Sequence, residues 1–271
     1  MRLPASLWFG GVVLAAIITL ALLGPSIAPY DPTQFAVRAR LQAPSAAHWF
    51  GTDEFGRDVL SRILHGARYS LAMGFGATAL ALGLGLPLGL IAAFRQGWLS
   101  AAILRVMDLL ISLPPILLGL LILAVTQPST AKTIIAVGLV YVPIMVRLTR
   151  GVALALMQEE FIEAARARGE GAFHILAREV LPNLWPPVIV ETGLRITFAI
   201  LLGSALSFLG LGPQPPASEW GLMIAESRAF LEQAPWIGLA PGLCLCVLLV
   251  AVNLVGEGLR EVLDPRLRGH G

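Results

Sequence analysis

Long apolar runs without charge alternate with short polar stretches along the whole chain. A helix needs about 20 residues, with a range of about 17–25, to cross the hydrocarbon core of a bilayer. Four runs meet this requirement: residues 7–23, 69–94, 109–125 with an amphipathic lead-in from 103, and 234–255. Two more, 133–146 and 186–210, meet it when a short charged shoulder is included. The pattern predicts an all-α integral membrane protein with about six transmembrane helices.

Proline and glycine punctuate these runs. We expect Pro114-Pro115 and Pro143 to bend the third and fourth spans, because proline removes a backbone donor and clashes with the preceding turn. Such bends serve either packing alone or a transport path. The second span carries a stripe of small residues that favours close approach of another helix. The stripe consists of Gly83, Gly85 and Gly89.

The composition agrees with a membrane protein, because 56% of the residues are hydrophobic and only 13% are charged. Soluble domains contain about 25% charged residues. A net charge of +2 is too small to favour nucleic acid as a partner. Lys132 is the only lysine and belongs to no phosphate-binding G-x-x-x-x-G-K-[ST] loop, so the chain is not its own P-loop ATPase.

The residues that usually carry catalysis or metal binding are scattered. The histidines at positions 48, 65 and 174 lack the spacing of metal ligands, so we predict no metal and no cofactor. Ser204 and Ser207 stand without a base beside them, which argues against a membrane-embedded enzyme. Cys244 and Cys246 point to different faces of a helix, so we expect no disulfide between them.

The distribution of arginine predicts the orientation. Short loops rich in arginine usually face the cytoplasm, which places both termini inside. The residues that support this orientation are Arg2, Arg95, Arg105, Arg147, Arg150, Arg166, Arg168, Arg178, Arg260, Arg266 and Arg268. The long segment after the first span would then be external, although it contains Arg38, Arg40, Arg57, Arg62 and Arg68. Long translocated segments follow the rule only weakly. A cleaved signal peptide is disfavoured because the first apolar run exceeds the usual h-region.

A charged segment between the fourth and fifth spans is longer than the short polar stretches that separate most of the apolar runs. Residues 157–168 favour an amphipathic helix, which Gly169 and Gly171 end. A second short helix follows at 173–181, closed by Pro182. The resulting paired-helix knob would present Phe161, Ile162 and Phe173 to a groove on a partner. The alternative is an ordinary amphipathic loop at the membrane interface.

The sequence motif of the knob favours docking to a partner over an interfacial loop. Glu163-Ala164-Ala165, followed by Gly169 and Leu181-Pro182, resembles the EAA loop by which ABC-importer permeases dock onto their ATPase subunits. The flanks at 160–167 and 181–183 resemble the dipeptide, oligopeptide and nickel branch. Further blocks resemble the second, C-type permease subunit of that branch. These blocks lie at 50–62, 205–212, 214–216, 219–221, 234–236 and 263–266, so the resemblance runs from about 30 to 266.

The resemblance implies a type I ABC-importer permease fold with cytoplasmic coupling helices. An anchoring span and external segment would occupy residues 1–68, the permease core 69–258 and a cytoplasmic tail 259–271. The chain would be a non-catalytic subunit in a bacterial or archaeal inner membrane. Its expected partners are a second homologous permease, one or two ABC ATPase subunits, an extracytoplasmic substrate-binding protein and the lipid bilayer. Short peptides, nickel chelates and related small solutes stay open as substrates. A secondary carrier or channel is the rival function.

The resemblance also implies which residues couple to the ATPase. These are Phe161, Glu163, Ala164, Ala165, Gly169, Phe173, Leu181 and Pro182. Glu163 is expected to make a charge-assisted contact or to cap its helix, Gly169 to form the corner, and the two alanines to allow close backbone approach. Arg168 departs from the leucine usual in this branch, and Glu170-Gly171 departs from a pair of small residues.

Charged residues form two further candidate sites. Glu191 and Arg195 are four residues apart and Arg105 and Asp108 three apart, so each couple is expected to pair on one helix face or to contact substrate. At the external rim, charged residues would either contact a binding protein or order the rim itself. They are Asp53, Glu54, Arg57 and Asp58.

Overall fold

The computed structural model describes residues 4–95 and 97–263. Arg2, Arg266, Arg268 and most of the block at 263–266 therefore lie outside the described residues. Within this part the chain is all-helical, and its one extended pairing is an isolated bridge between Thr52 and Asp58. The α-helices are α1 Ala5–Ile27, α2 Val59–Phe94, α3 Trp98–Ile111, α4 Pro115–Ala124, α5 Thr130–Leu156, α6 Glu160–Ala167, α7 Ala172–His174, α8 Leu181–Phe208, α9 Trp220–Ser227 and α10 Trp236–Leu263. Two 3-10 turns, η1 Val37–Ala39 and η3 Arg228–Phe230, and one π-helix, η2 Ile175–Val180, complete the order.

Five helices among the described residues are long and apolar enough to cross a membrane, or six if α3 and α4 form one broken span. The prediction of about six spans is confirmed. The third span, predicted at 109–125 with a bend at its prolines, is broken, since α3 and α4 meet at 93°. The break lies at Pro114-Pro115, as expected, because proline ends one helix and fits the first turn of the next. Pro143, in contrast, lies inside the single helix α5.

Helix α2 begins at Val59, ten residues before the predicted start of its span at 69. The reason is an N-cap, because the Asp58 carboxylate accepts the Ser61 N–H at 2.8 Å. A carboxylate at this position satisfies a donor that the first turn leaves free. Helix α2 therefore extends beyond its apolar stretch and includes the charged residue Arg62, which is buried.

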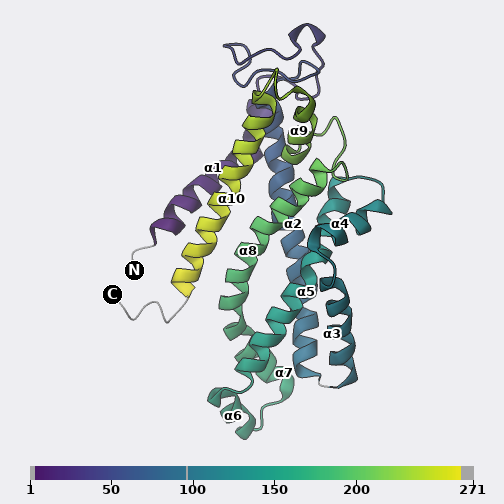
Figure 1. Ribbon diagram of the computed structural model, residues 1–271. Helices are drawn as coiled ribbons and strands as arrows, with labels where there is room; N and C mark the ends of the chain where they lie inside the picture. Colours follow the sequence, from purple (N-terminus) through teal and green to yellow (C-terminus); the bar gives the residue numbers. More distant parts are fainter. Residues whose placement is uncertain (1–3, 96, 264–271) are drawn as a thin grey trace.

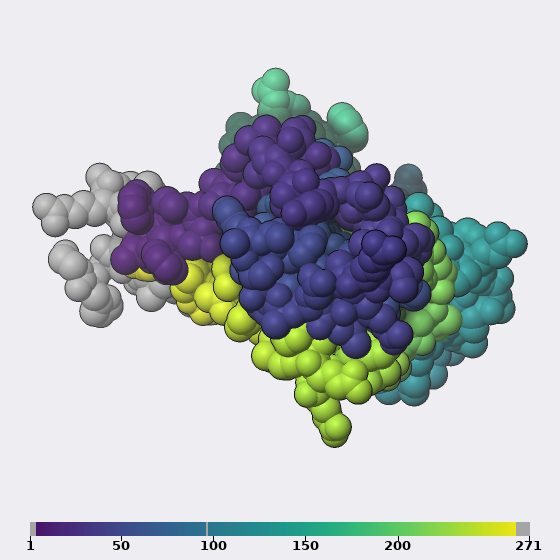
Figure 2. Space-filling view, turned by 90° about the horizontal axis from the view of Figure 1, so that it is seen from above, coloured from purple at the N-terminus to yellow at the C-terminus, as the bar shows by residue number. Residues whose placement is uncertain are grey.

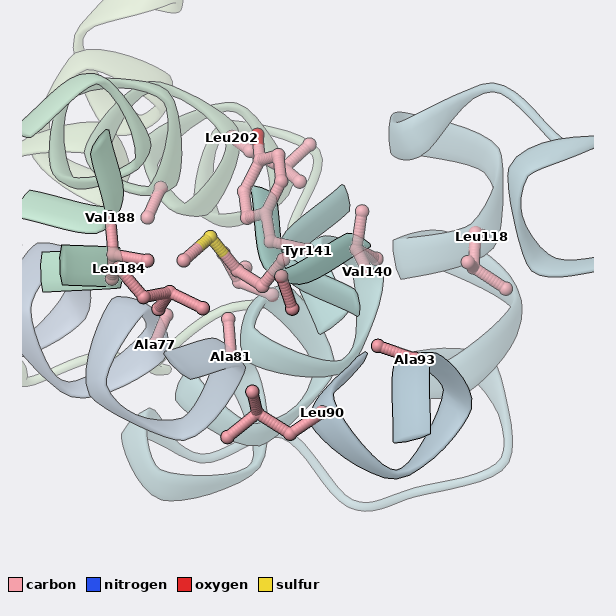
Figure 3. Packing of buried hydrophobic residues seen from close by; sticks show 14 of the residues in the cluster. Ala77, Ala81, Leu90, Ala93, Leu118, Val140, Tyr141, Leu184, Val188 and Leu202 are labelled. Atoms are coloured by element: carbon pink, nitrogen blue, oxygen red, sulfur yellow. The ribbon is translucent and has the colours of Figure 1, made fainter. Parts of the chain in front are cut away.

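Helices α2, α5 and α8 form the main core (Figures 1 and 3). Gly85 and Gly89 of α2 lie against α5, where an added Cβ would stand 2.4 Å from the Met145 Cβ and 2.6 Å from the Thr149 Cβ. An added Cβ at Gly83 would meet nothing within 4 Å. The small-residue stripe is thus confirmed at two of its glycines, while Gly83 contacts no other helix among the described residues of this chain.

Helix α1 packs against α10 at the side of this core (Figure 1). An added Cβ on Gly258 would stand 2.4 Å from the Leu7 Cβ, so the start of α1 lies beside the end of α10. Pro25 lacks the N–H that would bond to the Ala21 carbonyl. The Arg68 Nε of α2 donates to that carbonyl at 2.7 Å and so satisfies the group that the proline frees.

The two ends of the bundle differ. Residues 28–58, here called the cap, spread across one end, and Figure 2 shows them over the helix ends when viewed from above. Helices α6 and α7 project from the opposite end (Figure 1). The site of the predicted knob and the site of the predicted rim are therefore separated by the full length of the spans.

Candidate coupling site and buried charge networks

Helix α6 ends in a glycine corner. The Glu170 N–H donates to the Ala165 carbonyl at 3.2 Å, and the Gly169 N–H donates to the Arg166 carbonyl at 2.9 Å. These two bonds form a Schellman motif, which satisfies carbonyls at the end of a helix. Gly169 has a φ of 81°, a left-handed conformation that glycine adopts without strain. The predicted corner is therefore present at the predicted residue.

The knob, defined as residues 160–180, has an inner and an outer face. Ile162 and Ala165 are fully buried and join the core cluster of α2, α5 and α8. Phe161 and Phe173 are exposed, the latter to 80%. The expectation that Ile162 is presented to a partner is therefore wrong, because it anchors the knob to its own chain. Phe173 is the most prominent apolar side chain of the outer face.

The second helix of the knob does not end at Pro182. Helix α7, the π-helix η2 and α8 run on as one 37-residue helix, so the predicted end is wrong. Pro182 is the second residue of α8 and lies inside this continuous helix, directly after the π-helix η2. The Asn183 side-chain amide donates to the Glu179 carbonyl at 2.7 Å. The knob is thus joined directly to a membrane span.

Charges tie the two arms of the knob together. The Arg168 Nε donates to the Glu170 carboxylate at 2.7 Å, and an Arg168 Nη2 lies 3.8 Å from the Glu179 carboxylate. His174 Nε2 lies 3.6 Å from the same Glu170. The arginine that departs from the leucine usual in this branch therefore has contacts within the knob. Glu163 is exposed in the first turn of α6, where a carboxylate suits the helix dipole.

The remaining predicted coupling residues are likewise divided between exposed and buried positions. Ala164, Gly169 and Pro182 are exposed. Leu181 is half-buried and packs against the main core. Ala165 is buried, so the close approach that it allows is to this chain's own helices. The outer face that a partner can reach is formed by the aromatic residues, Glu163 and Ala164.

One of the two predicted ion pairs within the spans is present. The Arg195 Nε lies 2.8 Å from the Glu191 Oε1 on α8, although its N–H is not aligned with that oxygen. The guanidinium also lies over the rings of Tyr141 and Phe198, with Cζ 5.5 Å and 5.0 Å from the ring centroids. The Tyr141 hydroxyl donates to the Phe198 carbonyl at 3.1 Å. Arg195 is therefore held by one carboxylate and two aromatic faces.

The expected pair of Arg105 and Asp108 is wrong. The Asp108 carboxylate instead accepts from Arg147 of α5 at 2.6 Å, while Arg105 is exposed. Both partners of this bridge are about half exposed, and surface bridges contribute about 0–1 kcal/mol. Its effect is to join α3 to α5 rather than to stabilise one helix face.

The cap contains a buried charge network. Asp53 accepts from the Arg57 Nε at 2.6 Å and from the Arg62 Nη1 at 2.7 Å. Arg62 also donates to Glu226 of α9 at 2.8 Å. Asp53, Arg57 and Arg62 are almost completely buried. These rim residues therefore order the cap and fasten it to α2 and α9, and two arginines that disagree with the orientation rule are neutralised.

The other two rim candidates have different surroundings. Asp58 caps α2 and its second oxygen lies 2.9 Å from His48 Nδ1. Glu54 lies 3.5 Å from an Arg57 Nη2, and its Oε2 has no hydrogen-bond partner among the described residues. Burial raises the pKa of the Glu54 carboxyl above its usual range, and neighbouring Asp53 and Glu226 add to the shift. Glu54 is thus an ionisable group that the fold disfavours in its charged form.

Several residues of these networks were not predicted as site residues. Arg62 and Glu226 are 164 positions apart, Arg147 and Asp108 are 39 apart, and Tyr141 belongs to another span than Arg195. Short-range spacing carries no signal for such pairs. The available hint was that each charged residue stands in or beside an apolar run, where an unpaired charge is costly.

Residues 85–269 match the family model described as "Binding-protein-dependent transport system inner membrane component". The chain belongs to this family. Residues 6–44 also match the "N-terminal TM domain of oligopeptide transport permease C". The predicted resemblance to a C-type permease is confirmed. With its apolar helices, the chain is a multi-pass inner membrane protein.

Curated relatives cover nearly the whole chain. The chain is 42% identical to the "Dipeptide transport system permease protein DppC" of Alkalihalophilus pseudofirmus, over 96% of the chain and 85% of that protein. It is 39% identical to the "Glutathione transport system permease protein GsiD" of Pectobacterium atrosepticum, over 95% and 86%. Permeases are the membrane components of such systems, so the prediction of a non-catalytic subunit is confirmed.

A solved structure shares the fold. A chain of the inward-facing MetNI methionine ABC transporter superposes with a TM-score of 0.63 at 18% identity, over 75% of this chain and 96% of that chain. The predicted type I importer fold is confirmed by this likeness.

Proposed function

We propose that this protein is a membrane-spanning subunit of an ATP-driven importer of short peptides. It works beside a second homologous permease and is driven by one or two ABC ATPase subunits, with an external binding protein delivering the substrate. The relatives named above support a peptide cargo over a nickel chelate, because their names specify dipeptides and glutathione. Residues 1–68, 69–258 and 259–271 serve as anchor with external segment, permease core and cytoplasmic tail.

The observation that carries the proposal is the continuity of the knob with α8. The exposed outer face of α6 and α7 offers Phe161, Glu163, Ala164 and Phe173 to a groove on the ATPase. The inner face is locked to the main core through Ile162 and Ala165. A partner that moves this face moves a rigid body that includes a membrane span.

The mechanism follows from this connection. Closure of two ATPase subunits on ATP displaces the knob, and α8 tilts with it because no loop separates them. The core of α2, α5 and α8 then rocks against the second permease between inward and outward openings. The knob transmits force, and the chemistry of ATP hydrolysis stays in the partner.

The orientation follows from the same argument. The knob faces the cytoplasm, where ATP is present, and the cap faces the outside. With α3 and α4 counted as one broken span, the chain would cross the membrane six times, and an even number of crossings supports having both termini on the knob side. The contact between Leu7 and Gly258 supports this, because it sets the start of α1 beside the end of α10.

The test is uptake by the complete complex. The permease is co-expressed with its genomic neighbours, purified and reconstituted in liposomes with the loaded binding protein, and uptake of labelled dialanine is measured. We expect uptake that requires ATP and that persists when ionophores collapse the ion gradients. Uptake that follows an ion gradient without ATP would instead establish a secondary carrier.

The orientation has its own test. A single cysteine at Phe173 or at Trp49 is introduced after Cys244 and Cys246 are replaced by alanine. A membrane-impermeant maleimide applied to intact spheroplasts is expected to label the cysteine at 49, which lies in the cap, and not the one at 173. Labelling at 173 alone would place the knob outside and contradict the proposal.

A further inference from the structure

The exposed face of α8 is chemically different from the exposed faces of α1 and α10. Leu194, Phe198 and Leu201 are exposed along it, and the pair of Glu191 and Arg195 lies at its edge. Arg195 stands half-way along α8 and within the span predicted at 186–210. A charged side chain at this depth costs about 2.5–3.5 kcal/mol or more when it faces lipid.

Other exposed faces fit lipid. Along α1 the exposed side chains include Trp8, Phe9 and Leu22, and along α10 they include Leu239 and Leu243. The span of α1 contains no acidic or basic residue. Compared with α1 and α10, the exposed face of α8 is marked by its ion pair as turned toward a water-filled path or toward another subunit.

We propose that Arg195 and Glu191 bind the charged ends of the peptide as it crosses the membrane, an inference that rests on the proposed function. A short peptide carries a carboxylate and an ammonium a few atoms apart. Arg195 offers a planar guanidinium that binds carboxylates through two parallel hydrogen bonds. Glu191 offers the carboxylate that an ammonium needs.

The geometry suits a pair that opens around substrate. The two side chains are 14% and 20% exposed, so water and solute can reach them. The Arg195 Nε is buried 2.8 Å from the Glu191 Oε1 and makes no aligned hydrogen bond there, so a substrate carboxylate would bind the terminal nitrogens of the guanidinium. The rings of Tyr141 and Phe198 hold the guanidinium in place when its contact with Glu191 is lost. In the empty state the two residues neutralise each other, so no buried charge is left alone.

Space for a ligand lies beside the pair. A cavity of about 420 Å³ borders α8 and α10 and is lined by Pro187, Val190, Glu191, Leu194 and Arg260. It is mostly apolar with charged groups of both signs, and its volume lies in the range of about 300–1,000 Å³ typical of small-molecule sites. Glu191 thus connects the ion pair to a space that accepts a peptide.

The test uses the complete reconstituted complex. Arg195→Gln is expected to lower dialanine uptake about tenfold or more, since it removes a charge-assisted contact, while ATPase stimulation by the loaded binding protein stays within about twofold of the unmodified complex. Unchanged uptake would overturn the inference. If Arg195→Gln fails to assemble, the neutral pair Glu191→Gln with Arg195→Gln leaves no unpaired charge and replaces it, with the same two outcomes.

A charge reversal separates binding from helix stabilisation. Glu191→Arg combined with Arg195→Glu keeps an ion pair on α8 but places a carboxylate between the two aromatic rings. Uptake is expected to stay low, whereas recovery to the level of the unmodified complex would assign the pair a merely structural role. Failure of the proposed function would appear differently, because the unmodified complex would then show no ATP-dependent uptake. Failure of this inference alone would leave the unmodified complex active and the variants equally active.

Discussion

Arg62 and Glu226 are joined by an ion pair of 2.8 Å although they stand 164 positions apart in the chain. Arg62 is fully buried, and the same side chain also binds Asp53 at 2.7 Å. The network therefore connects the cap, the start of α2 and helix α9. Arginine suits this position because its guanidinium offers several donors in a fixed plane.

Removal of Glu226 should destabilise the protein strongly. Glu226→Ala leaves Arg62 with the single carboxylate of Asp53, while Arg57 keeps Asp53 and Glu54, and breaking a buried pair from one side costs about 3–5 kcal/mol. The measurement is the thermal unfolding midpoint of the detergent-purified protein. Glu232→Ala is the matched control, since Glu232 is exposed in the following loop and should leave the midpoint unchanged. Equal midpoints for the two variants would contradict the role given to the network.

The glycine corner should be sensitive to a single methyl group. Gly169→Ala forces a side chain into the left-handed region at a cost of about 1–2 kcal/mol, although the surrounding space is open. We expect the corner to shift and binding-protein-stimulated ATPase activity to fall. Gly171→Ala is the control, because Gly171 has a φ of −70° and equally open surroundings. A normal activity in both variants would show that the corner does not position the knob.

The two faces of the knob should respond differently to truncation. Ile162→Ala is expected to lower stability by about 2–5 kcal/mol, because Ile162 is fully buried. Phe173→Ala should leave stability unchanged and reduce co-purification of the ATPase, because Phe173 is 80% exposed. Thermal unfolding and the ratio of ATPase to permease after purification measure the two effects. Intact ATPase binding by Phe173→Ala would remove this residue from the docking face.

Close packing of α2 on α5 predicts a contrast between two glycines. Gly85→Val places a Cβ 2.4 Å from the Met145 Cβ and should separate the helices, with a loss of folded protein after extraction. Gly83→Val meets nothing within 4 Å and should be tolerated. Size-exclusion chromatography of the two variants in detergent gives the answer, and equal yields would show that α2 and α5 do not approach as closely as described.

The raised pKa of Glu54 predicts a dependence of stability on pH. Because the folded-state pKa lies above the unfolded-state value, the folded protein binds the proton more tightly, and stability is lost as pH rises through the folded-state pKa. Glu54→Gln removes the ionisable group and should raise the unfolding midpoint at neutral pH by no more than about 2–4 °C. The gain should vanish in acid below the normal glutamate range. A variant less stable at neutral pH would mean that the Arg57 contact outweighs the burial.

The sequence predicted the spans and the corner because both depend on local patterns. Apolar runs set the number of spans, and Gly169 set the corner through its conformational freedom. The start of α2 was misplaced because Asp58 caps a helix that begins outside the apolar stretch. The end of the knob was misplaced because the helix continues through Pro182, which directly follows the π-helix η2.

Local sequence patterns could not predict which residues from distant parts of the chain form pairs. Arg105 and Asp108 have a spacing suited to an ion pair, yet Asp108 binds Arg147 because α5 lies beside α3 in space. The rim residues were recognised as a group, but their burial depends on Arg62 and Glu226. In each case the missing information was which helices are neighbours.

The continuous helix from α7 through α8 fixes the distance between the outer face of the knob and the ion pair in the span. Phe173 at its tip and Arg195 at mid-span belong to one rod, and at 1.5 Å per residue they stand about 33 Å apart along its axis. A tilt of this helix by about 5° at its tip shifts the position of Arg195 by about 3 Å, and the π-helix and the prolines between the two residues are the places where it can bend. A small displacement at the knob is therefore transmitted to residues within the bilayer.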